Sequence, residues 1–156
     1  MNTAIYPGSF DPLTRGHQSI ALRAASLFSH LVIAIGQNSE KRNIFSIEQR
    51  LEFITKTFEN VDNISVVAYD GLTVDFCRQN QINYIVRGVR SDMDWGVESA
   101  IAAANKILCP TVETVFLLTE HQYIGISSSV VRDILKNKGD VSAFLPKEVM
   151  GIVKSL

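Results

Sequence analysis

The sequence has few residues that could build a metal site or a disulfide framework. It contains two cysteines, Cys77 and Cys109, and three histidines that lie far apart in the chain. None of these residues has the short spacing of a zinc or redox motif, so the sequence predicts neither a metal centre nor a disulfide scaffold. Two lone cysteines are typical of reduced thiols that pack inside a cytoplasmic protein.

The sequence also lacks an excess of charge and a long apolar run. Its formal net charge is −1, so no overall field draws it to nucleic acid or to a membrane surface. No stretch approaches the ~20 apolar residues of a membrane span. The N-terminus does not combine a basic segment, an apolar run and a cleavage site, as a secretory leader would. We therefore expect a cytoplasmic protein with no nucleic-acid or membrane partner, in which any anion site is local.

What the sequence does contain is an alternation of short apolar runs and amphipathic segments. Its 156 residues predict one domain over residues 1–156. The expected strands cover 4–6, 31–36, 64–69, 84–87 and 111–118. The expected helices begin near 17, 46 and 146, or cover 72–80, 92–108 and 127–138. This alternation predicts a Rossmann-like, doubly wound, five-stranded parallel sheet with helices on both faces.

Local patterns mark two of the expected helices. Ser46 and Gln49 form a capping box at the start of the second expected helix. In the first helix, apolar residues recur at helical spacing and predict its buried face. These residues are Ile20, Ala24, Leu27, Phe28 and Leu31.

Residues that could line a ligand site, many of them polar or basic, follow every expected strand. In an open parallel sheet, ligands bind beyond the carboxyl ends of the strands. The residues in question are Ser9, Phe10 and His17, then Lys41, then Leu72 and Thr73, then Arg87, Gly88 and Arg90, and finally Tyr123 and Ser127–Ser129. All five loops open on the same edge of the sheet, which predicts one shared anion pocket.

The first loop joins a strand to a helix through Gly8 and ends at His17. Backbone N–H groups and the positive end of a helix meet in such a turn, and this geometry binds phosphate. Taken alone, the two residues fit better with a loop that only turns the chain and a histidine that caps the helix. The other four loops shift the interpretation to a phosphate site.

Two other segments also have a structural alternative. Arg87 and Arg90 are suited to bidentate phosphate binding, but they fit equally well as ion-pair partners of Asp92, Asp94 or Glu98. The serine run 127–129 stands at an expected helix start, where one serine suffices as a cap and three suggest phosphate contacts. Arg132, one turn further, either supports the serines or pairs with Asp133. The charged loop around Lys41 would, on pattern alone, be a solvated surface.

Two signatures in the sequence resemble those of the nucleotidyltransferase superfamily. Residues 14–17 (Thr-Arg-Gly-His) are similar to its T/H-x-G-H signature, and residues 126–129 (Ile-Ser-Ser-Ser) to its second signature. The string Tyr-Pro-Gly-Ser-Phe-Asp-Pro at 6–12 is narrower and resembles the bacterial phosphopantetheine adenylyltransferases. The likeness extends over almost the whole chain, including residues 87–90, 139–141 and 144–146.

The resemblance implies an activity and a set of partners. Members of this family transfer AMP from ATP to 4′-phosphopantetheine, which yields dephospho-coenzyme A and pyrophosphate in the penultimate step of coenzyme A synthesis. It also implies Mg²⁺ bound mainly through the ATP phosphates, with no metal-binding side chain. A homohexamer and feedback by coenzyme A are further expectations of the same kind.

The resemblance also assigns residues to roles. His17 would stabilise the transition state, with Lys41 and Arg90 as further catalytic residues. The implied ATP-binding residues are Ser9, Phe10, His17, Gly88, Val89, Arg90, Glu98, Tyr123, Ile124, Gly125, Ile126, Ser127, Ser128 and Ser129. The implied residues for phosphopantetheine are Ser9, Lys41, Thr73 and Arg87. Two positions depart from the family pattern, since Ser9 replaces a common threonine and Asn43 a common proline.

Two other functions remain open at the level of sequence. One is a sister nucleotidyltransferase with another phosphate acceptor, such as a nicotinamide-mononucleotide adenylyltransferase or a cytidylyltransferase. The other is a non-catalytic nucleotide-sensing module that has kept the fold. The string at 6–12 and the segment 87–90 favour the phosphopantetheine enzyme over the first, and the presence of His17 and the serine run argues against the second.

Overall fold

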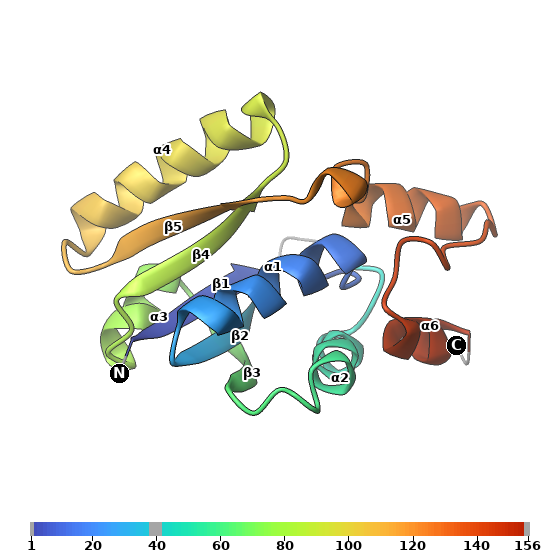
Figure 1. The fold of residues 1–156 in the computed structure, drawn as a ribbon, viewed down its shortest axis with the longest axis horizontal. Helices are drawn as coiled ribbons and strands as arrows, with labels where there is room; N and C mark the ends of the chain where they lie inside the picture. The colour runs from blue at the N-terminus through green and yellow to red at the C-terminus, as the bar shows by residue number, and fades with distance from the viewer. Residues whose placement is uncertain (1, 38–41, 155–156) are drawn as a thin grey trace.

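A computed structural model describes residues 2–37 and 42–154 and shows an α/β architecture (Figure 1). Five strands form one parallel sheet in the order β3-β2-β1-β4-β5. The strands are β1 (Thr3–Gly8), β2 (His30–Gln37), β3 (Ile64–Asp70), β4 (Tyr84–Val89) and β5 (Glu113–Leu118). The predicted five-stranded parallel sheet is thereby confirmed.

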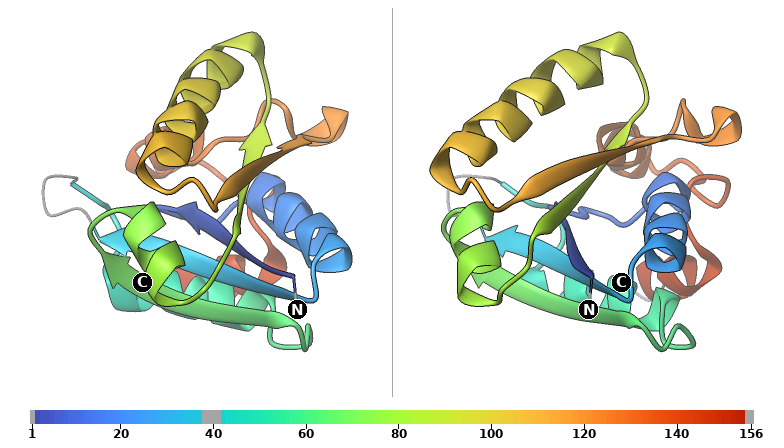
Figure 2. Two further views of the ribbon diagram at one scale, coloured as in Figure 1. Left: turned by 90° about the vertical axis from the view of Figure 1, so that its left-hand side faces the viewer. Right: turned by 60° about the vertical axis from the view of Figure 1, so that its left-hand side comes forward.

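Helices cover both faces of this sheet (Figure 2). They are α1 (Arg15–Leu27), α2 (Ile47–Thr57), α3 (Thr73–Gln79), α4 (Asp92–Leu108), the 3₁₀ helix η1 (His121–Tyr123), α5 (Ser128–Lys136) and α6 (Lys147–Val153). One core packs α1, α2, α5 and α6 against residues such as Tyr6 and Ile33. A second core packs α3 and the segment after α4, through Cys109 and Val112, against strand residues such as Ile5 and Val32 on the opposite face. Alternate strand residues thus enter opposite cores, as in a doubly wound fold.

The order of the strands places a crevice between β1 and β4. The chain moves from β1 to β2 and β3 on one side, then returns to add β4 and β5 on the other. β1 pairs with β2 over its whole length, but with β4 only at Ala4–Tyr84 and Ile5–Ile85. Both strands continue beyond these pairs, so their carboxyl ends separate. This is the switch point at which open α/β sheets bind ligands.

Local sequence features explain where the helices begin. Thr14 caps α1 and forms a capping box with His17, and Ser46 caps α2 with Gln49 as predicted. Helix α4 has the predicted bounds. Across residues 2–37 and 42–154, no helix has the length and apolar character needed to cross a bilayer.

The structure corrects several details of the sequence interpretation. Strand β1 continues to Gly8, two residues beyond its predicted end, β5 begins at Glu113 and α5 ends at Lys136. Strand β4 continues to Val89, two residues beyond its predicted end. Leu27, predicted on the buried face of α1, is 62% exposed, because it ends the helix where the chain turns towards β2. Leu31, by contrast, is completely buried in β2.

Leu27 and Leu31 provide a matched test of this packing. We expect Leu31→Ala to lower the free energy of unfolding by about 2–5 kcal/mol, because it leaves a cavity in a core strand. Leu27→Ala should lower it by less than about 1 kcal/mol, since that side chain is already in contact with water. Urea denaturation of both variants measures the difference. Equal losses would contradict the described burial.

Candidate active site

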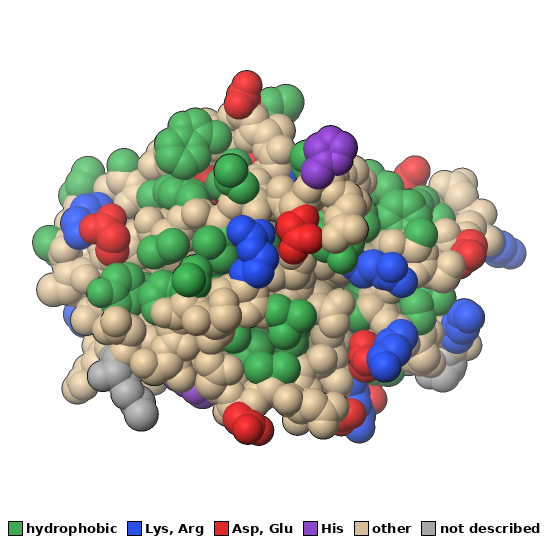
Figure 3. Space-filling model, in the orientation of Figure 1, with side chains coloured by type: hydrophobic (Ala, Val, Ile, Leu, Met, Phe, Trp, Pro, Cys, Tyr) green, Lys and Arg blue, Asp and Glu red, His purple; other side chains and the backbone are tan. Residues whose placement is uncertain are grey.

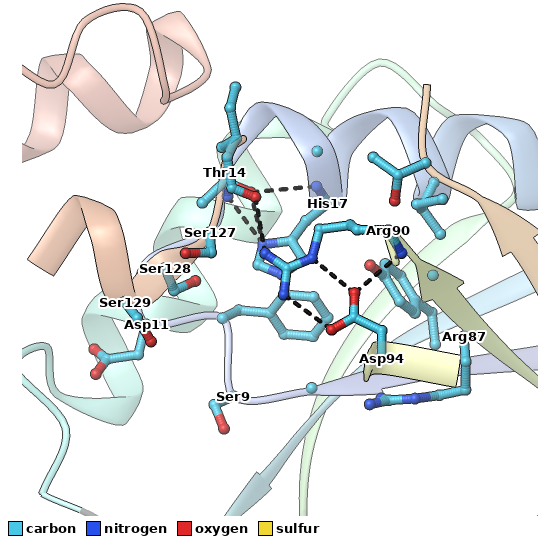
Figure 4. Close-up of a pocket in the computed structure, with 18 of the residues that line it drawn as sticks. Ser9, Asp11, Thr14, His17, Arg87, Arg90, Asp94, Ser127, Ser128 and Ser129 are labelled. Atoms are coloured by element: carbon cyan, nitrogen blue, oxygen red, sulfur yellow. Dashed lines mark hydrogen bonds and ion pairs between the residues drawn. The ribbon is translucent and has the colours of Figure 1, made fainter. Parts of the chain in front are cut away.

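A cavity of about 330 Å³ opens where β1 and β4 separate (Figure 4). Its wall is formed by the loop after β1, the start of α1, the end of β4, the first turns of α4 and the start of α5. Eleven of the predicted site residues line it: Ser9, Phe10, His17, Arg87, Gly88, Arg90, Glu98, Ile126, Ser127, Ser128 and Ser129. Segments far apart in the sequence therefore meet at one place.

A second cavity of about 320 Å³ adjoins the first on the side of α3 and α4. Thr73 lines it together with Tyr69 and Asn105. The two cavities share five lining residues, Pro7, Gly8, Ser9, Arg87 and Glu98. This arrangement can hold two ligands side by side with a common wall between them.

The remaining predicted residues lie elsewhere. Val89 is buried and lines neither cavity. Tyr123, Ile124 and Gly125, in and after η1, also line neither cavity, although they lead into the serine run. Lys41 lies outside the described residues. The roles assigned to these residues stay predictions.

His17 is held in one orientation by the start of its own helix. Its Nδ1 accepts a hydrogen bond from the backbone N–H of Thr14 at 3.1 Å. Because a backbone N–H can only donate, the neutral ring carries its proton on Nε2. Phe10 packs edge-on against the imidazole with ring centroids 5.1 Å apart. The Nε2–H group is therefore the donor that His17 has for a ligand.

The surroundings of His17 also keep it uncharged. Burial lowers its pKa to about 4, and the positive charges of Arg90 and Arg87 act in the same direction. At neutral pH the ring is a neutral hydrogen-bond donor. The His17 ring thus binds a ligand without a positive charge, in contrast to the guanidinium groups of Arg87 and Arg90.

The loop between β1 and α1 is clamped by side chains from two helices. Buried Arg50 of α2 donates from Nη1 to the carbonyl of Ser9 at 2.9 Å. Arg132 of α5 donates from Nη1 to the carbonyl of Asp11, also at 2.9 Å. These bonds hold the loop although Phe10 has a φ of 47°, a conformation that costs about 1–2 kcal/mol for a residue other than glycine.

Asp11 extends this clamp to the start of α2. Its buried carboxylate accepts hydrogen bonds from the backbone N–H groups of Ile44 and Phe45, both at 3.0 Å. The sequence interpretation missed the roles of Asp11 and Arg50. Two sequence features could have indicated these roles: Asp11 is an acidic residue within the string at 6–12, and Arg50 lies on the buried side of an amphipathic helix.

Each serine at the start of α5 has a different partner. Ser127 caps the helix by accepting from the N–H of Val130 at 3.2 Å. Ser128 donates to the carbonyl of Pro12 at 2.8 Å, and Ser129 accepts from Nη2 of Arg132 at 3.0 Å. Arg132 thus supports the serine run, one of the two alternatives. The first turns of α1 and α5 both border the cavity, so two positive helix ends meet there.

Gly88 allows α1 to approach β4 closely. A Cβ atom at this position would lie 3.1 Å from Cγ1 of Ile20 on α1. A larger residue would require the Ile20 side chain to shift by a few tenths of an ångström in this tight contact. Gly88 therefore shapes the cavity through its lack of a side chain.

Comparison with known proteins agrees with this geometry. Residues 5–134 match the model of the cytidylyltransferase-like family. A phosphopantetheine adenylyltransferase of Flavobacterium psychrophilum is 47% identical over 149 residues, which are 96% of this chain and 98% of the relative. Those of Flavobacterium johnsoniae and Cytophaga hutchinsonii are 46% and 43% identical, over 96% and 94% of this chain and 97% of each relative. The chain belongs to the phosphopantetheine adenylyltransferase family.

This adenylyltransferase has little in its cavity that would bind a metal ion by itself. Among residues 2–37 and 42–154, no group of three or more His, Cys, Asp or Glu residues could hold one. The carboxylates that line the first cavity are already engaged: Asp11 by backbone N–H groups, Asp94 and Glu98 by arginines.

The environment of His17 predicts its titration. In NMR spectra of the free protein we expect the ring to show the Nε2–H tautomer and a midpoint near pH 4. A His17→Gln variant identifies the resonance. Between that midpoint and the ordinary value of 6.5, the unfolded chain binds a proton that the folded site does not. This site therefore lowers stability as the pH falls through that interval. A midpoint at or above 6.5 would contradict the described environment.

Proposed function

We propose that this chain transfers the adenylyl group of ATP to the phosphate of 4′-phosphopantetheine, the activity for which its relatives are named. The products are dephospho-coenzyme A and pyrophosphate, and the reaction belongs to coenzyme A synthesis. The observation that carries the proposal is the pair of cavities with a shared wall at Ser9, Arg87 and Glu98. A reaction between two phosphate-bearing ligands requires such an arrangement.

The chemistry needs no protein nucleophile. A phosphate monoester has a second pKa of about 6, so it is largely dianionic at neutral pH and needs no general base. One of its oxygens bonds to the α-phosphorus of ATP, and the bond from that phosphorus to the bridging oxygen breaks. Pyrophosphate leaves with the electron pair. Catalysis then consists of aligning two polyanions and stabilising the charge that develops on the α-phosphate.

The residues that line the cavities are suited to these tasks. His17 donates from Nε2 to an oxygen of the α-phosphate. The two helix ends, the serine run 127–129 and Arg90 bind the triphosphate in the first cavity. Arg87, Ser9 and Thr73 bind the acceptor, whose phosphate lies at the shared wall. Lys41 acts on the reacting phosphates in this assignment, as the resemblance implies.

Mg²⁺ accompanies the nucleotide in this proposal. The ion neutralises phosphate charge when it is bound, and ATP oxygens and water supply most of its ligands. The engaged state of Asp11, Asp94 and Glu98 supports this assignment.

We also propose that the chain forms a homohexamer in the cytoplasm, with coenzyme A as a feedback ligand, as the resemblance implies. Within α4, which the structure describes in full, no residue is buried. Met93, Val97 and Ile107 of this helix are 85%, 62% and 81% exposed, and Leu118 at the end of β5 is 73% exposed. Apolar side chains gather over α4 and β5 in Figure 3. An apolar surface of this kind supports self-association.

The specificity for both substrates is tested by pyrophosphate release. We expect release with ATP and 4′-phosphopantetheine, and little release when CTP replaces ATP or nicotinamide mononucleotide replaces the acceptor. Turnover with CTP or with the mononucleotide would favour a sister nucleotidyltransferase. ATP binding without any turnover would favour a nucleotide-sensing module.

The role of His17 has a separate test. His17→Ala should lower kcat by about 10²–10³-fold, because it removes one donor to the charge that develops in the transition state. The Kd for ATP should change much less, since the helix ends and Arg90 remain. His30→Ala, at the opposite end of the sheet, is the control and should keep a nearly normal kcat. Near-normal turnover of His17→Ala would exclude the residue from the mechanism.

A further inference from the structure

Two carboxylates of α4 reach the two arginines of the candidate site. Asp94 and Glu98 are four residues apart, so they lie on the same side of the helix, one turn from each other. Asp94 pairs with Arg90 and Glu98 with Arg87. The dashed lines in Figure 4 show the first of these pairs inside the cavity. Both arginines that are expected to bind phosphate are therefore held by the same helix.

The Arg87–Glu98 pair is bidentate and largely shielded from water. Nε donates to Oε2 at 2.7 Å and Nη2 to Oε1 at 2.6 Å, while Nη1 donates to the carbonyl of Pro7. The side chains are 29% and 15% exposed, respectively. A guanidinium has five N–H groups. These contacts use three of the N–H groups of Arg87 and leave one free N–H group on each terminal nitrogen. The bonds to Glu98 and Pro7 fix the plane of the guanidinium.

The Arg90–Asp94 pair is built differently. Oδ2 of Asp94 accepts from Nε of Arg90 at 2.9 Å and from its backbone N–H at 3.0 Å, and Oδ1 accepts from Nη2 at 3.3 Å. Nη1 of Arg90 donates to the carbonyl of Ile126, just before the serine run. The hydrogen bond from Arg90 also lowers the pKa of Asp94, so this carboxylate is charged at neutral pH. Asp94 thus fixes both the side chain and the backbone of Arg90.

The two pairs lie at different places in the site. Arg90 and Asp94 line only the first cavity, next to His17 and the serine run. Arg87 and Glu98 line both cavities and belong to their shared wall. Glu98 uses both carboxylate oxygens on Arg87. Like charge opposes a contact of this carboxylate with the ATP phosphates, and the bond to Arg87 occupies one acceptor site on each of its oxygens.

We propose that Asp94 and Glu98 are positioning residues that serve one ligand each: Asp94 orients Arg90 for the nucleotide, and Glu98 orients Arg87 for the acceptor phosphate. This assignment rests on the proposed function. The carboxylates neutralise part of the positive charge of the site. Each guanidinium then presents its remaining N–H groups to a phosphate in a fixed plane. In-line transfer requires the two reacting phosphates to be aligned, and fixed donors provide this alignment.

Separate binding measurements on two variants test the division. By calorimetry, Asp94→Asn should raise the Kd for ATP about tenfold and leave that for 4′-phosphopantetheine within about twofold. Glu98→Gln should raise the Kd for 4′-phosphopantetheine about tenfold and leave the Kd for ATP within about twofold. In turnover, each variant should show a lower kcat as well as a higher KM for its own ligand, because a loosely held arginine misaligns the phosphate it binds.

Matched controls make the same chemical change without touching an arginine of the site. Asp92→Asn removes an exposed carboxylate from the same first turn of α4, and Glu52→Gln removes an exposed one from α2. Both should bind and turn over the two substrates as the unmodified chain does. Thermal unfolding of all four variants shows whether any effect is simply a loss of stability.

Three results would overturn the proposal. Weaker ATP binding by Glu98→Gln, with acceptor binding unchanged, would mean that Glu98 serves the nucleotide. Tighter binding with an undiminished kcat in either variant would mean that the carboxylate only competes with phosphate. An equal loss for both ligands together with a lower Tm would mean a structural role. If the unmodified chain binds ATP but not 4′-phosphopantetheine, the proposed function fails, whereas the Asp94 measurement with ATP still stands.

Discussion

The separation of β1 from β4 beyond the Ile5–Ile85 pair is the constraint on which the site depends. Strands that stayed paired to their carboxyl ends would close the space in which both cavities lie. The separation frees the loop after β1 to carry Ser9 and Phe10, and it leaves Arg87 and Arg90 at the end of β4 facing that loop. Helix α1 covers the opening closely because Gly88 has no side chain to keep it away.

Among the described residues that line the first cavity, part of the positive charge is paired with carboxylates. His17 is neutral, and Arg87 in β4 and Arg90 directly after it have carboxylate partners on α4. Two helix ends and the backbone N–H groups they expose add to the attraction that the site has for polyanions. The helix dipoles and the two guanidinium groups bound by carboxylates are already oriented, so they need little rearrangement during the reaction. This suits catalysis by alignment and charge stabilisation.

Rigidity of the first loop comes from contacts that span the chain. Arg50 and Arg132 bind its carbonyls, and the carboxylate of Asp11 ties it to the start of α2. These contacts hold Phe10 in its left-handed backbone conformation, and its ring in turn packs on His17. The orientation of His17 thus depends on three helices besides its own loop, since α2, α5 and the capping residue of α1 all contribute.

Periodicity, helix caps and short signatures are local patterns, and they were sufficient to predict the succession of strands and helices along the chain, the parallel sheet and the family. The sequence also placed most of the site residues on one edge, since carboxyl ends of parallel strands must meet there. The fold was needed to show which carboxylates pair with Arg87 and Arg90, that Asp11 accepts from the N–H groups of residues 44 and 45, and that Leu27 is exposed. Such partners are distant in the chain or depend on the packing of other elements, and no local pattern specifies them.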